Sequence, residues 1–151
     1  MLEHANNVAQ VCYYLKQINL AYTRLMDQRL ADLGLTQAQG EVLFMLWQNP
    51  DLSQGQLRQQ LGVTAPTLSG LIDTLAYKGL IERQANPADP RRNNLVLTDR
   101  AQMLRNGYME IKATVTNAFA TGLSEAELQL LSQWLKQLNH NLVDITTQNS
   151  R

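Results

Sequence analysis

Residues 53–79 read SQGQLRQQLGVTAPTLSGLIDTLAYKG, and this stretch decides the fold because it predicts two short helices joined by a tight turn. Ser53 and Gln56 have the spacing of a capping box at the start of the first helix. Gly62 allows the turn, and Thr64 caps a second helix, whose early proline is tolerated because the first helical positions need no intrahelical donor. The apolar face of the second helix, at spacings of three and four residues, consists of Leu68, Leu71, Ile72 and Leu75. This pattern is typical of a helix-turn-helix.

The segment at residues 89–98, DPRRNNLVLT, predicts the second half of a β-hairpin that follows the helix-turn-helix. Short strands are expected at 80–83 and 95–97, on either side of a polar loop. Arg91 and Arg92 would lie near the tip of this hairpin. An isolated tip of this kind is ordinarily a solvated loop, but its position directly after a helix-turn-helix favours contact with a nucleic acid.

The flanking segments predict long helices, so the fold class is mainly α with a small β-hairpin wing. Residues 5–33 carry apolar side chains near the helical period, and Gly34 ends that helix. Thr36 starts a second helix with a capping box. A further helix is expected to begin at Thr98 or Asp99.

The last helix begins at Ser124 and carries a heptad-like apolar seam. Its members are Leu128, Leu131, Leu135, Leu138, Leu142 and Ile145. Such a seam on a terminal helix usually packs against a partner helix, and packing within the chain alone is the alternative. We expect one domain over 1–151, in which 36–98 form a winged helix-turn-helix lobe and 1–34 and 99–151 form a helical dimerisation region.

The composition fits a globular protein and excludes several classes of function. The 151 residues have a formal net charge of zero, but residues 53–100 carry six basic and four acidic residues, whereas residues 1–52 carry three basic and five acidic ones. The middle of the chain therefore suits contact with a polyanion. A single cysteine, Cys12, excludes an internal disulfide, and the N-terminus lacks the pattern of a signal peptide, so a cytoplasmic location is expected. Only His4, His140 and Cys12 offer nucleophile or base chemistry, so we expect no enzyme, and we expect no metal and no cofactor.

The second helix of a helix-turn-helix places its N-terminal part in the major groove of DNA. Hydroxyl side chains there can donate or accept hydrogen bonds, so they discriminate weakly between bases. The first basic residue of this helix is Lys78, near its end, and we therefore expect more specificity from the hairpin and from DNA shape. The residues predicted to face DNA from the two helices are Ser53, Gln54, Thr64, Ala65, Thr67, Ser69, Gly70 and Thr74.

The hairpin supplies the positive charge that the second helix lacks. Arg91 suits a narrow, electronegative minor groove, and Arg92 suits a phosphate. A carboxylate repels DNA, so Asp89 is expected to orient an arginine of the same loop. Asn93 completes the predicted hairpin contacts. Together, helix and hairpin predict a protein that binds double-stranded DNA in two grooves.

The chain resembles the MarR family of winged helix-turn-helix regulators over essentially its whole length, and its end most resembles the SlyA branch. The resemblance is carried by Leu35-Thr36, Leu61-Gly62-Val63, Leu75, Lys78-Gly79-Leu80-Ile81, Arg83 and Asp89-x-Arg91-x5-Leu97-Thr98. It implies a homodimer joined through the first helix and the last two helices, with Arg91 in the minor groove of a pseudo-palindromic operator. It also implies a repressor that releases DNA when it senses a small phenolic or anionic effector, or an oxidant.

Two positions depart from the pattern of the family. Arg58 stands where a small residue usually packs under the turn, and Ala101 replaces the usual glycine. Both residues are expected on helix surfaces, where neither change disturbs the fold.

A ligand site is predicted where the first helix meets the lobe. Asn19 interrupts an apolar stripe between Leu15 and Tyr22, and a polar group there needs a partner. The resemblance places effectors between the dimer helices and the lobe, where Asn19, Tyr22 and Trp47 could bind one. The alternative is that Asn19 bonds a neighbouring helix and that both aromatic residues belong to the core.

Two further functions stay open. Cys12 lies about as far from Leu35-Thr36 as the reactive cysteine of hydroperoxide sensors in the family, and Lys16, one turn away, would favour its thiolate. The tyrosines that serve such a cysteine are not matched, and a lone cysteine on an apolar stripe is usually a core residue. A winged-helix module that binds a protein without binding DNA is the other alternative, because the start of the second helix is uncharged.

Overall fold

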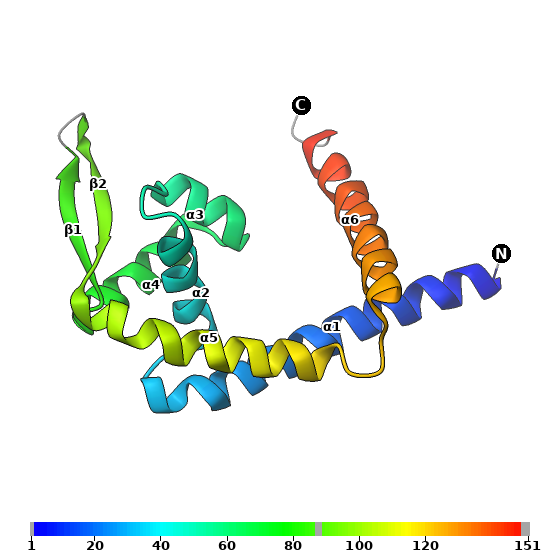
Figure 1. Ribbon diagram of the computed structural model, residues 1–151. Helices are drawn as coiled ribbons and strands as arrows, with labels where there is room; N and C mark the ends of the chain where they lie inside the picture. The colour runs from blue at the N-terminus through cyan, green and yellow to red at the C-terminus, as the bar shows by residue number, and fades with distance from the viewer. Residues whose placement is uncertain (1, 87–88, 149–151) are drawn as a thin grey trace. The chain divides into compact units, whose positions relative to one another are not determined.

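The computed structural model describes the backbone of residues 2–86 and 89–148 and the side chains of residues 5–85 and 94–143. It is mainly helical with one two-stranded antiparallel sheet, which confirms the expected fold class (Figure 1). Contacts group the chain into a first unit, Met1–Val115, and a second unit, Thr116–Arg151. The elements are α1 (Leu2–Leu30), the 3₁₀ helix η1 (Ala31–Leu33), α2 (Gln37–Gln48), α3 (Gln54–Leu61), α4 (Ala65–Tyr77), β1 (Ile81–Asn86), β2 (Asp89–Leu97), α5 (Asp99–Phe119) and α6 (Glu125–Gln148).

The helix-turn-helix forms as predicted, and side chains cap both helix starts. Ser53 Oγ accepts a hydrogen bond from the Gln56 backbone N–H at 3.2 Å, and Gln56 Oε1 accepts one from the Ser53 N–H at 2.9 Å. α3 ends at Gly62, whose φ of 64° lies in the left-handed region that glycine adopts without strain. Thr64 Oγ1 accepts from the Thr67 N–H at 3.3 Å and starts α4. These local bonds set the direction in which α4 leaves the turn.

The inner face of α4 is anchored in the core of the first unit. Leu68, Ile72 and Leu75 are buried as predicted, whereas Leu71 is partly exposed. Each fully buried aliphatic side chain contributes about 1.5–3 kcal/mol to stability. The same core includes buried residues from every other part of the unit, among them Met26, Leu30, Leu43, Leu46, Leu57, Ile81, Leu95 and Tyr108. α4 is therefore held along its whole inner face.

Ala101 also belongs to this core. Its expected place on a helix surface is wrong, because the first turn of α5 packs against the lobe and the Ala101 side chain is fully buried. Arg58 is exposed on α3, as predicted.

The hairpin follows α4 and is longer than the apolar pattern predicted. β1 pairs antiparallel with β2 from Ile81↔Leu97 to Ala85↔Asn93, with an irregularity after Ala85. Backbone pairing continues into the polar segment because ladder hydrogen bonds do not require apolar side chains. Among the hairpin side chains that the structure describes, those of Ile81 and Leu95, near its base, are buried.

α1 begins at Leu2 rather than at residue 5, and the chain turns after it at Gly34, whose φ is 67°. The last turns of α1 are buried through Met26 and Leu30. Its earlier apolar side chains are exposed, namely Val8, Val11, Tyr13, Tyr14, Leu15, Ile18 and Leu20. The stripe predicted from the sequence is thus buried only toward the C-terminal end of the helix.

In the second unit, α6 starts with the expected capping box. Ser124 Oγ accepts from the Glu127 N–H at 3.4 Å, and Glu127 Oε2 accepts from the Ser124 N–H at 2.8 Å. The hydrogen bonds that the Ser124 N–H and then the Ser124 hydroxyl donate to the Glu127 carboxylate lower the pKa of that carboxyl. Within the parts of the chain that the structure describes, none of the helices has the length and apolar content needed to cross a membrane.

Candidate nucleic-acid interface and aromatic cluster

The outer face of α4 is a row of small, exposed, mostly hydroxyl-bearing residues. It lies opposite the buried Leu68, Ile72 and Leu75, because residues three and four apart share one side of a helix. All six α4 and N-cap residues that the sequence predicted to face DNA are exposed: Thr64, Ala65, Thr67, Ser69, Gly70 and Thr74. None of these six side chains is charged or bulky, but the exposed side of α4 also carries Asp73 and Tyr77.

The hydroxyls of this face are partly used within the chain. Thr64 Oγ1 lies 2.8 Å from Thr67 Oγ1, and Thr74 Oγ1 donates to the Gly70 carbonyl at 2.8 Å. A hydroxyl has one donor and two acceptor positions. Thr74 therefore presents mainly acceptor capacity to the outside while its bond to Gly70 is intact. This agrees with the weak base discrimination expected from the sequence.

The two predicted contacts on α3 differ from each other. Ser53 is exposed, but its hydroxyl also donates to Gln56 Oε1 at 2.9 Å, so the side chain serves the cap of α3. Gln54 is partly buried.

The side chains of the predicted hairpin contacts lie outside the described residues. This applies to Asp89, Arg91, Arg92 and Asn93, whose backbone belongs to β2. The geometry between the Asp89 carboxylate and either arginine is therefore not described.

Polar contacts attach the base of the hairpin to α4. Arg83 Nη2 on β1 lies 2.5 Å from Asp73 Oδ1 on α4, and both side chains are partly exposed. Thr98 Oγ1 donates to the Gly79 carbonyl at 2.8 Å, after the last strand. Sequence reasoning missed the Asp73–Arg83 pair, although the opposite charges were visible. An exposed ion pair of this kind contributes about 0–1 kcal/mol, so it orients the hairpin more than it stabilises it.

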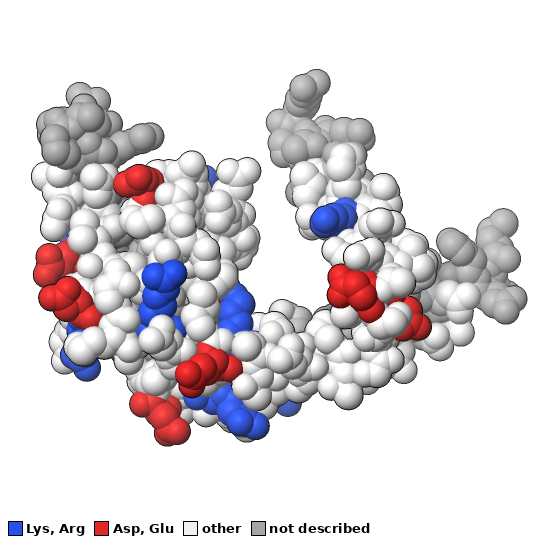
Figure 2. All heavy atoms as spheres, viewed as in Figure 1, with Lys and Arg blue, Asp and Glu red and all other residues white. Residues whose placement is uncertain are grey.

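Charge is mixed on the surface. On the face shown in Figure 2, basic and acidic side chains are interspersed over the first unit and do not form one broad basic area. This distribution follows from the equal numbers of basic and acidic residues. Attraction to a polyanion must therefore come from a few well-placed cations.

A second candidate site is a cluster of aromatic residues in the first unit. The Trp47 ring lies 5.4 Å from the Tyr108 ring, and the Phe44 ring lies 6.0 Å from it on the same helix as Trp47. Trp47 is 6% exposed, and its Nε1 has no hydrogen-bond partner among the described residues. A buried N–H without a partner costs about 1–3 kcal/mol. The cluster thus contains a donor that a bound acceptor would satisfy.

An acid–base pair borders this cluster. Lys112 Nζ lies 3.4 Å from Glu41 Oε1 and 3.4 Å from the centroid of the Phe44 ring. Tyr108 is fully buried and donates its hydroxyl to Glu41 Oε1 at 3.3 Å. Burial raises the pKa of Tyr108 strongly, and Glu41 raises it further. This phenol therefore stays a neutral donor at neutral pH.

Two of the three predicted ligand residues belong to this region. Trp47 is in the cluster. Tyr22 is partly buried, and this burial together with the charge of Glu41 raises the pKa of the Tyr22 phenol. Asn19 is exposed on α1 within one chain, so contacts inside the chain do not oblige it to find a partner, and its place in a ligand site stays a prediction. Sequence reasoning missed four members: Glu41, Phe44, Tyr108 and Lys112. Glu41 and Lys112 are 71 residues apart, and no local pattern joins them.

Cys12 is exposed on α1 rather than a core residue. Exposure makes the thiol accessible, but a reactive cysteine also needs a group that favours its thiolate. Redox sensing through Cys12 therefore stays a prediction.

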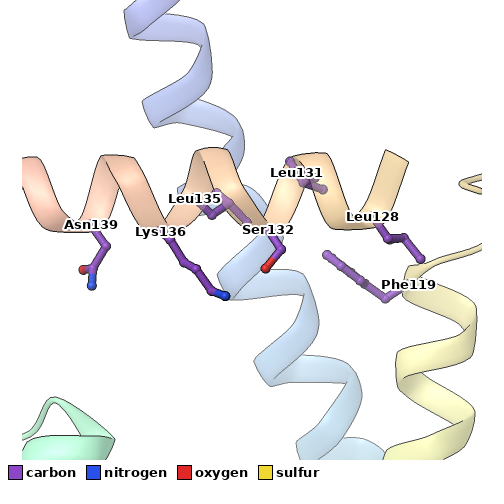
Figure 3. Close-up of a pocket in the computed structure, with 7 residues that line it drawn as sticks. All are labelled: Phe119, Leu128, Leu131, Ser132, Leu135, Lys136 and Asn139. Carbon is purple, nitrogen blue, oxygen red and sulfur yellow. The ribbon is translucent and has the colours of Figure 1, made fainter. Parts of the chain in front are cut away.

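The apolar seam of α6 is exposed over its later part. Leu135 is 38% exposed, Leu138 40% and Leu142 69%, whereas Leu128 and Leu131 are half-buried and the Ile145 side chain lies outside the described residues. An open pocket of about 380 Å³ lies along this helix, and Figure 3 shows the side chains that line it. Its lining consists of Phe119, Leu128, Leu131, Ser132, Leu135, Lys136 and Asn139. The seam predicted from the sequence is therefore present as an uncovered apolar face.

Comparisons with known proteins identify relatives of this chain. A family model described as MarR family matches residues 35–92. The crystal structure of transcriptional regulator PA3341 is 35% identical, with a TM-score of 0.78, and the match covers 89% of this chain and 98% of that one. A MepR–DNA complex from S. aureus is 28% identical, with a TM-score of 0.80, and the match covers 87% of this chain and 95% of that one.

The transcriptional regulator SlyA is also similar, with a TM-score of 0.82 over 89% of this chain and 94% of that one. At 20% identity, this match shows a shared fold and nothing more. The family match, together with the 35% identity to a transcriptional regulator covered almost completely, agrees with the winged helix-turn-helix described above. The chain is a transcription regulator rather than an enzyme, and it belongs to the MarR family.

Proposed function

We propose that this chain binds double-stranded DNA as a homodimer, with α4 in the major groove and the hairpin in the minor groove, and represses transcription. The observation that carries the proposal is the row of small, mostly hydroxyl-bearing residues that are exposed on α4, from Thr64 to Thr74. Small side chains let the backbone of a helix come close to base edges in the major groove, and hydroxyls can bond to them. The similar S. aureus protein MepR forms a complex with DNA, which supports the same role here.

In this proposal some residues contact the base edges and others contact the DNA backbone. Thr64, Ala65 and Thr67 lie at the start of α4 and meet the base edges, with Ser69, Gly70 and Thr74 following along the groove. Ser53 and Gln54 approach the DNA backbone from the start of α3. On the hairpin, Arg91 enters the minor groove, oriented by Asp89, while Arg92 and Asn93 contact the backbone.

A second copy of the chain is the partner proposed for the exposed seam of α6. The leucines of the seam follow spacings of three and four residues, which is the pattern that packs against another helix. Leu135, Leu138 and Leu142 are exposed within one chain, and exposed apolar surface of this kind usually marks an interface. A two-fold dimer would place two α4 helices on one side of the duplex, so its operator would be a pseudo-palindrome with half-sites about one helical turn apart.

We further propose that a small phenolic or anionic effector relieves DNA binding at the aromatic cluster. Trp47 Nε1 offers a buried donor. Lys112, which pairs with Glu41, brings a cation to the same cluster over the Phe44 ring. An aromatic compound with an acceptor group matches this chemistry. Tyr22 borders the site, and Asn19, one turn earlier on α1, would meet a ligand only at its edge.

Regulation of transcription requires access to the chromosome, so we place the protein in the cytoplasm. The alternative, a winged-helix module that binds only proteins, has no observation in its favour beyond the uncharged start of α4.

The test is DNA binding as a function of salt. Fragments that the purified protein selects from genomic DNA should bind more tightly than random competitor of the same length. Arg92→Ala, present twice in the dimer, should then lower the log–log salt slope by about 2, because about one counterion is released per neutralised phosphate. Arg105→Ala, at an exposed position of α5, is the control and should leave the slope unchanged.

Absence of any preference by a folded wild-type dimer at low salt would leave the protein-binding module as the better function. An unchanged slope for Arg92→Ala alone would remove only that arginine from the phosphate contacts.

A further inference from the structure

Lys78, the residue that ends α4, has a side chain that points into the protein's own framework. Its Nζ donates to the Gly34 carbonyl at 2.6 Å and to Gln39 Oε1 at 2.7 Å. Gln39 is only 7% exposed, and Lys78 itself is partly buried. The end of α4 is thus bonded to the corner between α1 and α2, which is about forty residues away in sequence.

The two acceptors are parts of the structure that connects α1 to α2. Gly34 is the left-handed residue that ends η1, the short helix directly after α1, and Gln39 completes the capping box of α2 by accepting from the Thr36 N–H at 3.3 Å. The same corner is tightened by Asp27 Oδ1, which accepts from the Gln37 N–H at 2.6 Å. A bond to this corner is therefore a bond to a rigid point.

The backbone of Lys78 makes a further connection. Its carbonyl accepts a hydrogen bond from Arg100 Nη1 at 3.0 Å, and Arg100 lies in the first turn of α5. One residue therefore joins the end of α4 to the α1–α2 corner through its side chain and to α5 through its carbonyl.

We propose that Lys78 is a positioning residue that sets the tilt of α4 and thereby the sequence specificity of DNA binding, without itself touching DNA. The inference rests on the proposed function of α4 as the recognition helix. The bases would meet the first turn of α4, which lies far along the helix from Lys78. A small change of angle at Lys78 therefore moves the first turn by a large distance. Twelve residues at 1.5 Å each give about 18 Å, so a tilt of about 10° at Lys78 moves the first turn by about 3 Å. That displacement is as long as a hydrogen bond and would break direct contacts to base edges.

The alternative role for a lysine near DNA is a contact with phosphate. Lys78 Nζ already has two oxygen acceptors within 2.7 Å, and a move toward phosphate would leave the buried Gln39 oxygen and the Gly34 carbonyl poorly satisfied. A lysine without such partners would be free to follow the phosphate. The geometry therefore favours the internal role.

Other contacts keep the fold intact when Lys78 is changed. The inner face of α4 is buried through Leu68, Ile72 and Leu75, and Asp73 pairs with Arg83 at the hairpin. Loss of the Lys78 contacts should consequently loosen the angle of α4 rather than unfold the lobe.

The experiment compares specific with non-specific DNA binding for Lys78→Met. The variant keeps the length of the side chain and removes the ammonium. We expect the affinity for the selected operator to fall about tenfold, which is the effect of losing one well-placed charged hydrogen bond, while non-specific affinity and the salt slope stay within error. Arg105→Met causes the same change in net charge at an exposed site of α5 and should change neither affinity.

Lys78→Arg restores a cation and donors at this position but with a different head-group geometry, so it should recover about half of the lost specificity and not all of it. Circular dichroism at the temperature of the binding assay must show both variants folded. If Lys78→Met unfolds, the comparison of Lys78→Arg with wild type still distinguishes the two roles. A phosphate contact would tolerate arginine, with an unchanged salt slope and no loss of specificity. A change in the tilt of α4 would lower the specificity and leave the salt slope unchanged.

Three results would overturn the inference. A fall in both affinities with a salt slope smaller by about 2 would make Lys78 a phosphate contact. Unchanged operator affinity in folded Lys78→Met would reduce the residue to a structural role. Wild-type protein without any operator preference would remove the proposed function itself, and it is distinguished from the other two because it appears before any variant is made.

Discussion

Gly40 of α2 has no room for a side chain, and this makes Gly40→Ala a sharp test of the packing around Tyr108. A Cβ at this position would lie under 3.0 Å from Tyr108 Cε2, 3.2 Å from Cδ2 and 3.3 Å from Leu30 Cδ1. The Tyr108 ring cannot move away freely, since it packs against Trp47 and Phe44 and its hydroxyl is bonded to Glu41.

Two opposing effects set the magnitude. Overpacking a core costs about 1–3 kcal/mol, and the tightly held ring places this site in the upper part of that range. Replacing glycine by alanine inside a helix returns about 1 kcal/mol through helix propensity. We therefore expect Gly40→Ala to lower the free energy of unfolding by about 1–2 kcal/mol.

Gly70→Ala is the matched control, because Gly70 also lies inside a helix and a Cβ there meets nothing within 4 Å. It should raise the free energy of unfolding by about 0.5–1 kcal/mol. Urea unfolding followed by circular dichroism, at one fixed protein concentration because a dimer is expected, gives both values. Equal or greater stability of Gly40→Ala relative to wild type would refute the packing described for Tyr108.

Two further variants test the interface and the aromatic cluster. Leu135→Asp places a charge in the α6 seam and should give monomers with little operator affinity, whereas Gln133→Asp, two residues away on the other side of the helix, should remain dimeric. A full-strength Leu135→Asp dimer in analytical ultracentrifugation would count against the seam. Trp47→Phe removes the unpaired indole N–H, so an effector that releases wild type from DNA should need about tenfold higher concentration relative to the variant's own operator affinity. Equal potency in a release titration would exclude Trp47 from the effector site.

Local signals in the sequence predicted the helix-turn-helix well. Thr36, Ser53, Thr64 and Ser124 all act as caps, and their bonds span only three residues. Gly62 ends α3 in the left-handed conformation, which glycine adopts without strain and which made it a turn signal in the sequence. Such features follow from neighbouring residues alone, so one sequence suffices to find them.

Other expectations failed where the deciding contact was distant. The strands extend beyond the apolar residues that predicted them, because the backbone of one strand supplies the partners of the other. Ala101 is buried because α5 returns to the lobe, and Asn19 is exposed because the core around α1 ends before it. A periodic pattern identifies a helix face, but it does not say how far along the helix that face is covered.

The amino-acid order alone determined which segments are helices, where most of them start, and which side of α4 is exposed, since caps, turns and periodicity act over a few residues. Only the tertiary structure decided that Lys78 bonds to Gly34 and Gln39, and that Glu41, Tyr108 and Lys112 meet beside Trp47. These contacts join residues about 40 to 70 positions apart. Their energies depend on packing that brings distant polar groups together out of water, and no short stretch of sequence contains that information.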